Sequence, residues 1–161
     1  MTMDFNEIVR DVYGDEARQR IRHAYDFARA AHVNQKRASG EEYFSHPCAV
    51  AKILVDLGMD ESTVSAAFLH DVVEDTDRTL DDLAAEGFSD EVIEALALLT
   101  HDGKDDYMTY VRPIKDNPIA KAVKLADLRH NSDLSRLDVV DEKALTRYER
   151  YQQAIAFLTG E

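Results

Sequence analysis

Apolar residues recur along this chain at intervals of three and four, which is the spacing of helices that bury one face. A first stripe lies between residues 15 and 32 and consists of Ile21, Ala24, Tyr25, Ala28 and Ala31. The same spacing predicts further helices that begin near Ser45, Asp60, Thr79, Ser89, Asn117 and Asp141. Since no segment alternates between apolar and polar residues as a strand does, we predict an all-α, single compact bundle of about six to eight helices.

Residues that favour helix ends stand at the boundaries of these segments. Ser45 is placed to cap a helix that has Pro47 in its first turn. Residues 79–82 have the spacing of a capping box. The helix over residues 60–75 is expected to be continuous, and the last helix is expected to turn Leu145 toward the core.

The composition is that of one globular domain. The chain has 161 residues, of which 45% are hydrophobic, enough to bury a core of its own, so residues 1–161 are expected to form a single domain. The N-terminus lacks the basic region and apolar run of a signal peptide, and no apolar stretch is long enough to cross a membrane. The single cysteine, Cys48, cannot form an internal disulfide. These features predict a cytoplasmic protein with no membrane partner.

The chain is strongly acidic, with a formal net charge of −13. This charge argues against a nucleic-acid partner, because proteins that bind a duplex carry a basic face. It does not exclude a small phosphorylated ligand, since a metal ion and a few local cations reverse the sign of the charge inside a pocket.

Three separated segments contain residues of the types that bind metals. His46 precedes a proline, His70 and Asp71 are adjacent in a largely apolar segment, and Asp127 lies in the helix that follows Asn117. Two imidazoles and two carboxylates suit Mn²⁺ or Fe²⁺, and the set is also compatible with Zn²⁺. A lone His-Asp pair would be weak evidence for a metal site, but three segments with compatible ligand types predict one such site.

Two further acids, Glu74 and Asp75, follow the His-Asp pair by one helical turn, so Glu74 shares the face of His70 and Asp71. Such acids suit the task of orienting and deprotonating a water that a metal activates. They are alternatively a solvated helix end. Acids near a helix C-terminus oppose the helix dipole, however, which favours the functional interpretation.

The basic residues near these segments allow two interpretations. Lys36 and Arg37 lie in a loop before His46, and Lys124 stands three residues before Asp127. Any of them is able to contact a phosphate above the metal, and a guanidinium does so with two hydrogen bonds. Each is equally compatible with an ordinary surface position.

Longer runs of sequence resemble a known family. Residues 31–47, which end in Tyr43-Phe44-Ser45-His46-Pro47, and residues 66–76, which contain the His-Asp pair, are similar to the hydrolase domain of RelA/SpoT-type alarmone enzymes, a branch of the HD-domain phosphohydrolases. The similarity extends over about residues 16–140. In length the chain is similar to stand-alone small alarmone hydrolases.

The resemblance implies an activity and a role for individual residues. His46, His70, Asp71 and Asp127 match the family's Mn²⁺ ligands, and Glu74 and Asp75 match the pair that prepares the water. Arg37 matches a basic residue near the substrate's phosphates or base, and Asn131 matches a residue that contacts the nucleotide. The implied reaction hydrolyses guanosine 3′,5′-bis(diphosphate), ppGpp, to GDP and pyrophosphate.

Two residues depart from the family pattern around the last ligand. Leu128 and Asp133 stand where the long enzymes have arginines, and an acid at the pocket rim would repel a highly phosphorylated ligand. Two alternatives therefore stay open, which are a phosphohydrolase acting on another nucleotide and a non-catalytic nucleotide-binding helical domain. Oligomeric state does not follow from the sequence.

Overall fold

The long helices form where the sequence predicts them, with their apolar stripes in the core. The computed structural model describes residues 4–33, 43–133 and 140–160, and within these ranges it contains helices and no strand. The helices of six or more residues there are α2 (Asp15–Ala31), α3 (Ser45–Asp56), α4 (Glu61–Leu69), α6 (Leu80–Ala85), α7 (Asp90–Leu99), α9 (Pro118–Asn131) and α10 (Glu142–Thr159). The predicted all-α fold is thereby confirmed.

Shorter helical segments connect the long ones. They are α1 (Phe5–Ile8), α5 (Val72–Asp75), α8 (Tyr107–Val111) and a 3-10 turn, η1 (Arg112–Asp116). The sequence analysis missed α1, because four residues are too few to show a helical period. Its Phe5 and Ile8 are nevertheless fully buried.

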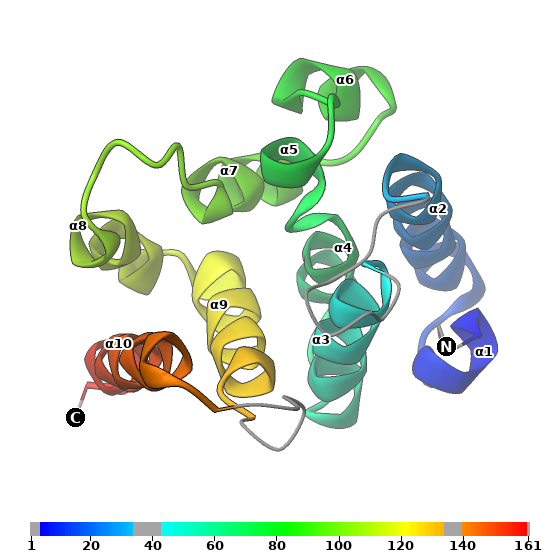
Figure 1. Ribbon diagram of the computed structural model, residues 1–161. Helices are drawn as coiled ribbons and strands as arrows, with labels where there is room; N and C mark the ends of the chain where they lie inside the picture. Colours follow the sequence, from blue (N-terminus) through cyan, green and yellow to red (C-terminus); the bar gives the residue numbers. More distant parts are fainter. Residues whose placement is uncertain (1–3, 34–42, 134–139, 161) are drawn as a thin grey trace.

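Helix α4 lies at the centre of the molecule, in contact with α2, α3, α7 and α9 (Figure 1). Every residue from Thr63 to Leu69 is buried, as expected for a helix that is covered on all sides. α1 and α2 lie on one side of this centre, and α8 and α10 lie on the other. The amino and carboxyl termini are consequently on opposite sides of the molecule.

The helix that was expected to run continuously over residues 60–75 is broken. α4 ends at Leu69, and α5 begins only at Val72. The His70 amide is 3.5 Å from the Ala67 carbonyl, three residues back, so the chain tightens into a turn here rather than continuing the α-helical ladder. His70 and Asp71 therefore occupy a bend between two helices.

Most predicted helix ends are confirmed, but one of them and one predicted core residue are corrected. The capping box of Thr79 and Asp82 forms at α6. Ser45, however, is the first residue of α3 rather than its N-cap, since the chain already turns helically at Phe44. Leu145, which was expected to face the core, is 47% exposed, and Ala144 is buried in its place.

Aromatic rings hold the start of α3 against α2 and α4. The Tyr25 ring on α2 lies 5.3 Å from the Phe44 ring and 5.4 Å from the Phe68 ring on α4, in edge-on geometries that stabilise aromatic pairs. All three residues are buried. Because Phe44 directly precedes α3, this cluster fixes the position of the first turn of α3, which contains His46.

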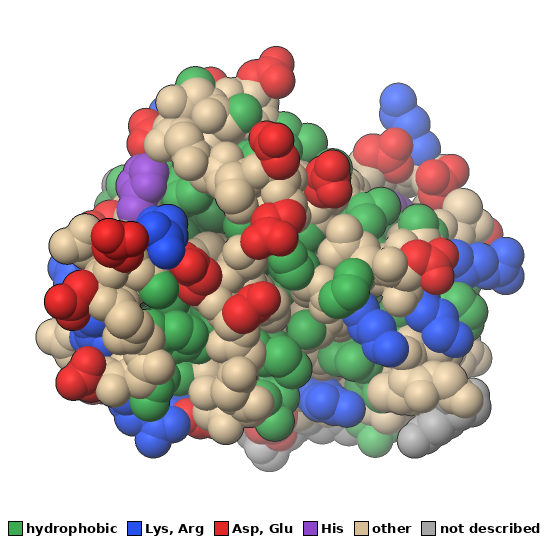
Figure 2. Space-filling view, turned by 180° about the vertical axis from the view of Figure 1, so that it is seen from behind, with side chains coloured by type: hydrophobic (Ala, Val, Ile, Leu, Met, Phe, Trp, Pro, Cys, Tyr) green, Lys and Arg blue, Asp and Glu red, His purple; other side chains and the backbone are tan. Residues whose placement is uncertain are grey.

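The surface carries the acidic charge that the composition indicates. Figure 2 shows acidic side chains spread over the rear face, among apolar and basic ones. Within the described ranges, no helix has the length and apolar character that crossing a membrane requires.

Candidate metal centre

Three parts of the chain bring the predicted metal ligands together. His46 lies in the first turn of α3, His70 and Asp71 lie in the bend after α4, and Asp127 lies on α9. Potential ligand atoms of His46, His70 and Asp71 lie within 4.8 Å of one another. The Oδ1 atom of Asp127 is 2.6 Å from the Nε2 atom of His46 and 3.5 Å from that of His70.

The His70 imidazole is oriented with its Nε2 atom toward the carboxylates. Its Nδ1 atom lies 2.7 Å from the Ala67 carbonyl oxygen, which can only accept, so Nδ1 carries a proton. Nε2 is buried and makes no well-aligned hydrogen bond with any described residue, although Asp71 Oδ2 lies 3.4 Å away. A buried polar atom of this kind usually has a partner, and a metal ion would satisfy it.

The His46 imidazole is held at both of its nitrogens. Its Nε2 atom contacts Asp127, and its Nδ1 atom lies 2.6 Å from the Nδ1 atom of His130, one turn after Asp127 on α9. The two rings stack with centroids 4.8 Å apart. His46 is only 2% exposed, so its orientation is set by these protein contacts.

Asp127 is supported by two neighbours on its own helix. Lys124 Nζ lies 3.0 Å from Oδ2, and the Asn131 side-chain amide donates to Oδ1 at 3.0 Å. Burial by itself raises the pKa of Asp127, but the Lys124 cation and the hydrogen bond with His46 outweigh it and hold that pKa well below its usual range. Asp127 is therefore an ionised carboxylate inside the protein.

The charges around these ligands favour a cation. Burial lowers the pKa of His46, which suits a neutral, ligating imidazole. Burial opposes a charge on His70 as well, but the carboxylates of Asp71 and Asp127 outweigh it and raise its pKa to about 9. Positive charge is thus stabilised between the carboxylates. Two imidazoles and two carboxylates fit Mn²⁺ or Fe²⁺, and are compatible with Zn²⁺.

Glu74 and Asp75 lie on α5, at the solvent-exposed edge of this cluster. Glu74 accepts a hydrogen bond from the His101 backbone amide, and the Tyr43 hydroxyl donates to Asp75 Oδ2. Although both side chains contact solvent, partial burial and nearby carboxylates raise the pKa of each. Both are thereby better proton acceptors than ordinary surface acids.

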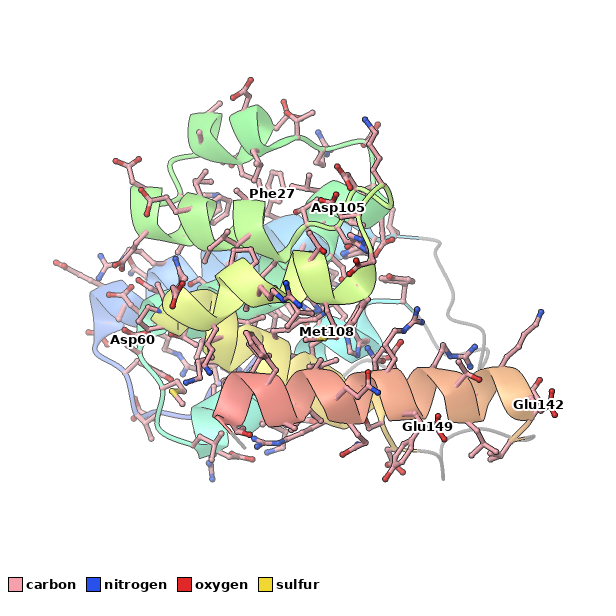
Figure 3. The ribbon with its side chains drawn as sticks, turned by 90° about the vertical axis from the view of Figure 1, so that its left-hand side faces the viewer. Phe27, Asp60, Asp105, Met108, Glu142 and Glu149 are labelled. Carbon is pink, nitrogen blue, oxygen red and sulfur yellow. The ribbon has the colours of Figure 1, made fainter. Side chains whose placement is uncertain are left out.

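A cleft of about 550 Å³ adjoins Asp127, a volume within the usual range for small-molecule sites. It lies between α9, α8 with its preceding loop, and α10. Figure 3 shows this side of the molecule, with α10 in front and Asp105 and Met108 marking the α8 segment. The residues that line the cleft are His101, Asp105, Asp106, Tyr107, Lys124, Asp127, Asn131, Arg150 and Tyr151.

A comparison with known protein families shows that the family described as HD domain matches residues 24–130 of this chain. The chain belongs to the HD-domain family. The matched range contains the bend at His70 and Asp71 and all four candidate ligands.

This HD-domain protein is similar to enzymes of the RelA/SpoT type, as the motifs predicted. It is 36% identical over 121 residues to the guanosine-3′,5′-bis(diphosphate) 3′-pyrophosphohydrolase of Aquifex aeolicus, covering 70% of this chain and 17% of that protein. It is 45% identical over 78 residues to the bifunctional (p)ppGpp synthase/hydrolase SpoT of Escherichia coli, covering 48% of this chain and 11% of that protein. The chain therefore spans less than a fifth of these relatives.

A solved structure shares the fold at nearly full length. It is the structure of a protein described as a metazoan ortholog of SpoT that hydrolyses ppGpp. The TM-score is 0.71 at 25% identity, and the match covers 91% of this chain and 87% of that one. This HD-domain chain thus has a structural relative of similar size.

The remaining predicted residues are distributed unevenly. Lys36 and Arg37 lie outside the described residues. Lys124 is 8% exposed, so it is buried beside Asp127 rather than on the surface. Leu128 is buried in the core, and the exposed Asp133 follows the end of α9. Neither of these two residues is among those that line the cleft.

Several site residues were missed by the sequence analysis. Arg150 and Tyr151 line the cleft from α10, far along the chain from every motif, and no spacing signals their approach. His130 and Tyr43 were given no role in the predicted site, yet they contact His46 and Asp75 directly. For His130, a signal was available, because it lies one turn from Asp127 on the same helix.

The buried contact between Lys124 and Asp127 leads to a prediction about stability. Replacing it with methionine in this HD-domain protein leaves the ionised Asp127 buried without its cation. Removing one partner of a buried pair costs about 3–5 kcal/mol, so the free energy of unfolding in chelator is expected to fall by about that amount. Urea denaturation measures it. Lys121→Met, one turn earlier on α9, is the control, and equal losses in the two variants would contradict the assignment.

Proposed function

We propose that this HD-domain protein is a metal-dependent phosphohydrolase that converts ppGpp to GDP and pyrophosphate. The observation that carries the proposal is the cluster of His46, His70, Asp71 and Asp127 beside a cleft large enough for a nucleotide. The names of the relatives, which describe ppGpp hydrolysis, support the choice of substrate.

In this proposal, His46, His70, Asp71 and Asp127 hold one divalent ion, with Mn²⁺ the preferred metal and Fe²⁺ and Zn²⁺ as alternatives. When bound, such an ion lowers the pKa of water and polarises a phosphoryl oxygen. The bend between α4 and α5 contributes by turning two adjacent side chains, His70 and Asp71, toward the same point. A continuous helix would direct them about 100° apart.

The proton of the attacking water would be accepted at a carboxylate oxygen of Glu74 or Asp75. Their backbone and side-chain partners, the His101 amide and the Tyr43 hydroxyl, hold the two acids in place. On the cleft side, the Lys124 ammonium and the Arg150 guanidinium are the cations positioned to bind phosphate oxygens. Asn131 is proposed to contact the nucleotide, and Arg37 is proposed to contact its phosphates or base.

A second candidate function is hydrolysis of a less phosphorylated nucleotide. The observation that favours it is that two acidic residues, Asp105 and Asp106, line the same cleft. Acids there oppose a ligand with several phosphates through like-charge repulsion. This candidate uses the same metal cluster and differs only in the substrate.

The test is incubation of the purified protein with ppGpp and Mn²⁺, with separation of the nucleotide and phosphate products by anion-exchange chromatography. We expect GDP and pyrophosphate in equal amounts, and no product when the metal is chelated. Release of orthophosphate from another nucleotide, with ppGpp left intact, would favour the second candidate. Metal-loaded protein that is inactive on both would favour a non-catalytic nucleotide-binding domain.

A further inference from the structure

The two imidazoles of the candidate metal centre differ in the group that contacts their Nδ1 atoms. Both Nε2 atoms point toward the carboxylates of Asp71 and Asp127. The Nδ1 atom of His70 faces a backbone carbonyl, whereas the Nδ1 atom of His46 faces the Nδ1 atom of His130 at 2.6 Å. A second imidazole thus occupies the position that the carbonyl takes behind His70.

A contact between two imidazole nitrogens has a defined chemistry. One of the two Nδ1 atoms must donate and the other must accept, so a single proton lies between them. A histidine that gives Nε2 to a metal carries its proton on Nδ1, and His46 would then be the donor to His130. Partners of this kind fix the tautomer and the ring orientation of a metal-binding histidine.

We propose that His130 is a positioning residue for the metal centre, which accepts the Nδ1 proton of His46 and so holds the His46 Nε2 lone pair toward the ion. The inference rests on the proposed role of His46 as a ligand. It does not depend on which nucleotide is the substrate.

An imidazole at this position can either donate or accept a hydrogen bond, whereas a carbonyl can only accept one. In the structure, His46 Nε2 lies 2.6 Å from Asp127 Oδ1. An imidazole that donates from Nε2 to this oxygen accepts at Nδ1, and His130 is then the donor. With Nε2 given to a cation, the direction of the bond between the two rings is reversed. His130 serves both states by exchanging its own tautomer, while the contact between the rings is kept.

The experiment compares two substitutions. His130→Leu keeps an apolar side chain but removes the hydrogen-bonding atom, whereas His130→Asn places an amide near the position of Nδ1 that is able to accept. Mn²⁺ affinity is measured from the free-ion signal in electron paramagnetic resonance. We expect His130→Leu to weaken Mn²⁺ binding by about 10–100-fold, the usual effect of losing such a partner, and His130→Asn to restore most of it. Thermal unfolding in chelator checks that both variants are folded.

A spectroscopic readout separates positioning from packing. In the Zn²⁺-loaded wild type, the His46 Nδ1 proton should give a downfield proton resonance, which His130→Leu should lack. Wild-type affinity in His130→Leu, or equal weakening in both variants, would overturn the inference while leaving the proposed function intact. A wild-type protein that binds neither Mn²⁺ nor Zn²⁺ would overturn both.

Discussion

Replacing Asp71 by alanine is expected to abolish both metal binding and hydrolysis. Asp71 Oδ2 lies 3.4 Å from His70 Nε2 and 4.0 Å from His46 Nε2, so its loss removes one ligand and much of the charge that favours a cation. Metal ions contribute several kcal/mol to such reactions, and about 1.4 kcal/mol corresponds to a tenfold change in rate. We therefore expect kcat/KM to fall by about 1,000-fold or more.

Metal binding by this variant is measured apart from catalysis. At a free Mn²⁺ concentration of 100 times Kd, binding should stabilise the wild type by about 2.7 kcal/mol, and this gain should be missing in Asp71→Ala. Asp77→Ala is the matched control, because it removes the same charge from a side chain that is 98% exposed. If Asp71→Ala retains both the gain and the activity, the proposed ligand set is wrong.

The second large effect is expected for Glu74→Gln, which preserves the shape of the side chain and an oxygen able to accept from the His101 amide. The variant should bind Mn²⁺ as the wild type does, since Glu74 is not a proposed ligand. Because it cannot take up the proton of the attacking water, kcat should fall by about 100- to 10,000-fold, the usual contribution of a general base. Turnover at saturating ppGpp and Mn²⁺ measures this loss.

The companion variant Asp75→Asn tests which of the two acids accepts the proton of the attacking water. If Glu74 is the base, Asp75→Asn should lower kcat less than Glu74→Gln does, because Asp75 then only orients the water. The reverse order would transfer the role to Asp75, which Tyr43 holds in place. Wild-type kcat in both variants would refute the involvement of this acidic pair.

The distribution of charge in the cleft bears on substrate choice. Lys124 and Arg150 contribute positive charge, and Asp105 and Asp106 contribute negative charge. The Arg150 guanidinium lies over the Tyr107 ring, 5.1 Å from its centroid, an arrangement that orients the cation at the cleft wall. Asp133, which was expected to lie at the pocket rim, does not line the cleft, whereas the two acids before α8 do.

Local signals in the sequence were sufficient to predict the helices and to single out the candidate ligands. The buried stripe of α2 and the capping box of α6 follow from short-range spacing, because each depends only on residues within one or two turns. The four candidate ligands could be proposed because their chemical types are compatible with one ion. The exposure of Leu145 on α10 and the break at His70–Asp71 were not predictable in this way, since packing against other helices decides them.

Only the tertiary structure decided what surrounds those ligands. The contact between His46 and His130 joins residues 84 positions apart, and Arg150 reaches the cleft because α10 packs against α9. No spacing rule connects such residues, because their proximity depends on how whole helices cross. The sequence thus determined the elements and the chemical types of the candidate ligands, whereas the packing of α3, α4, α9 and α10 determined how these residues are oriented and which side chains line the cleft.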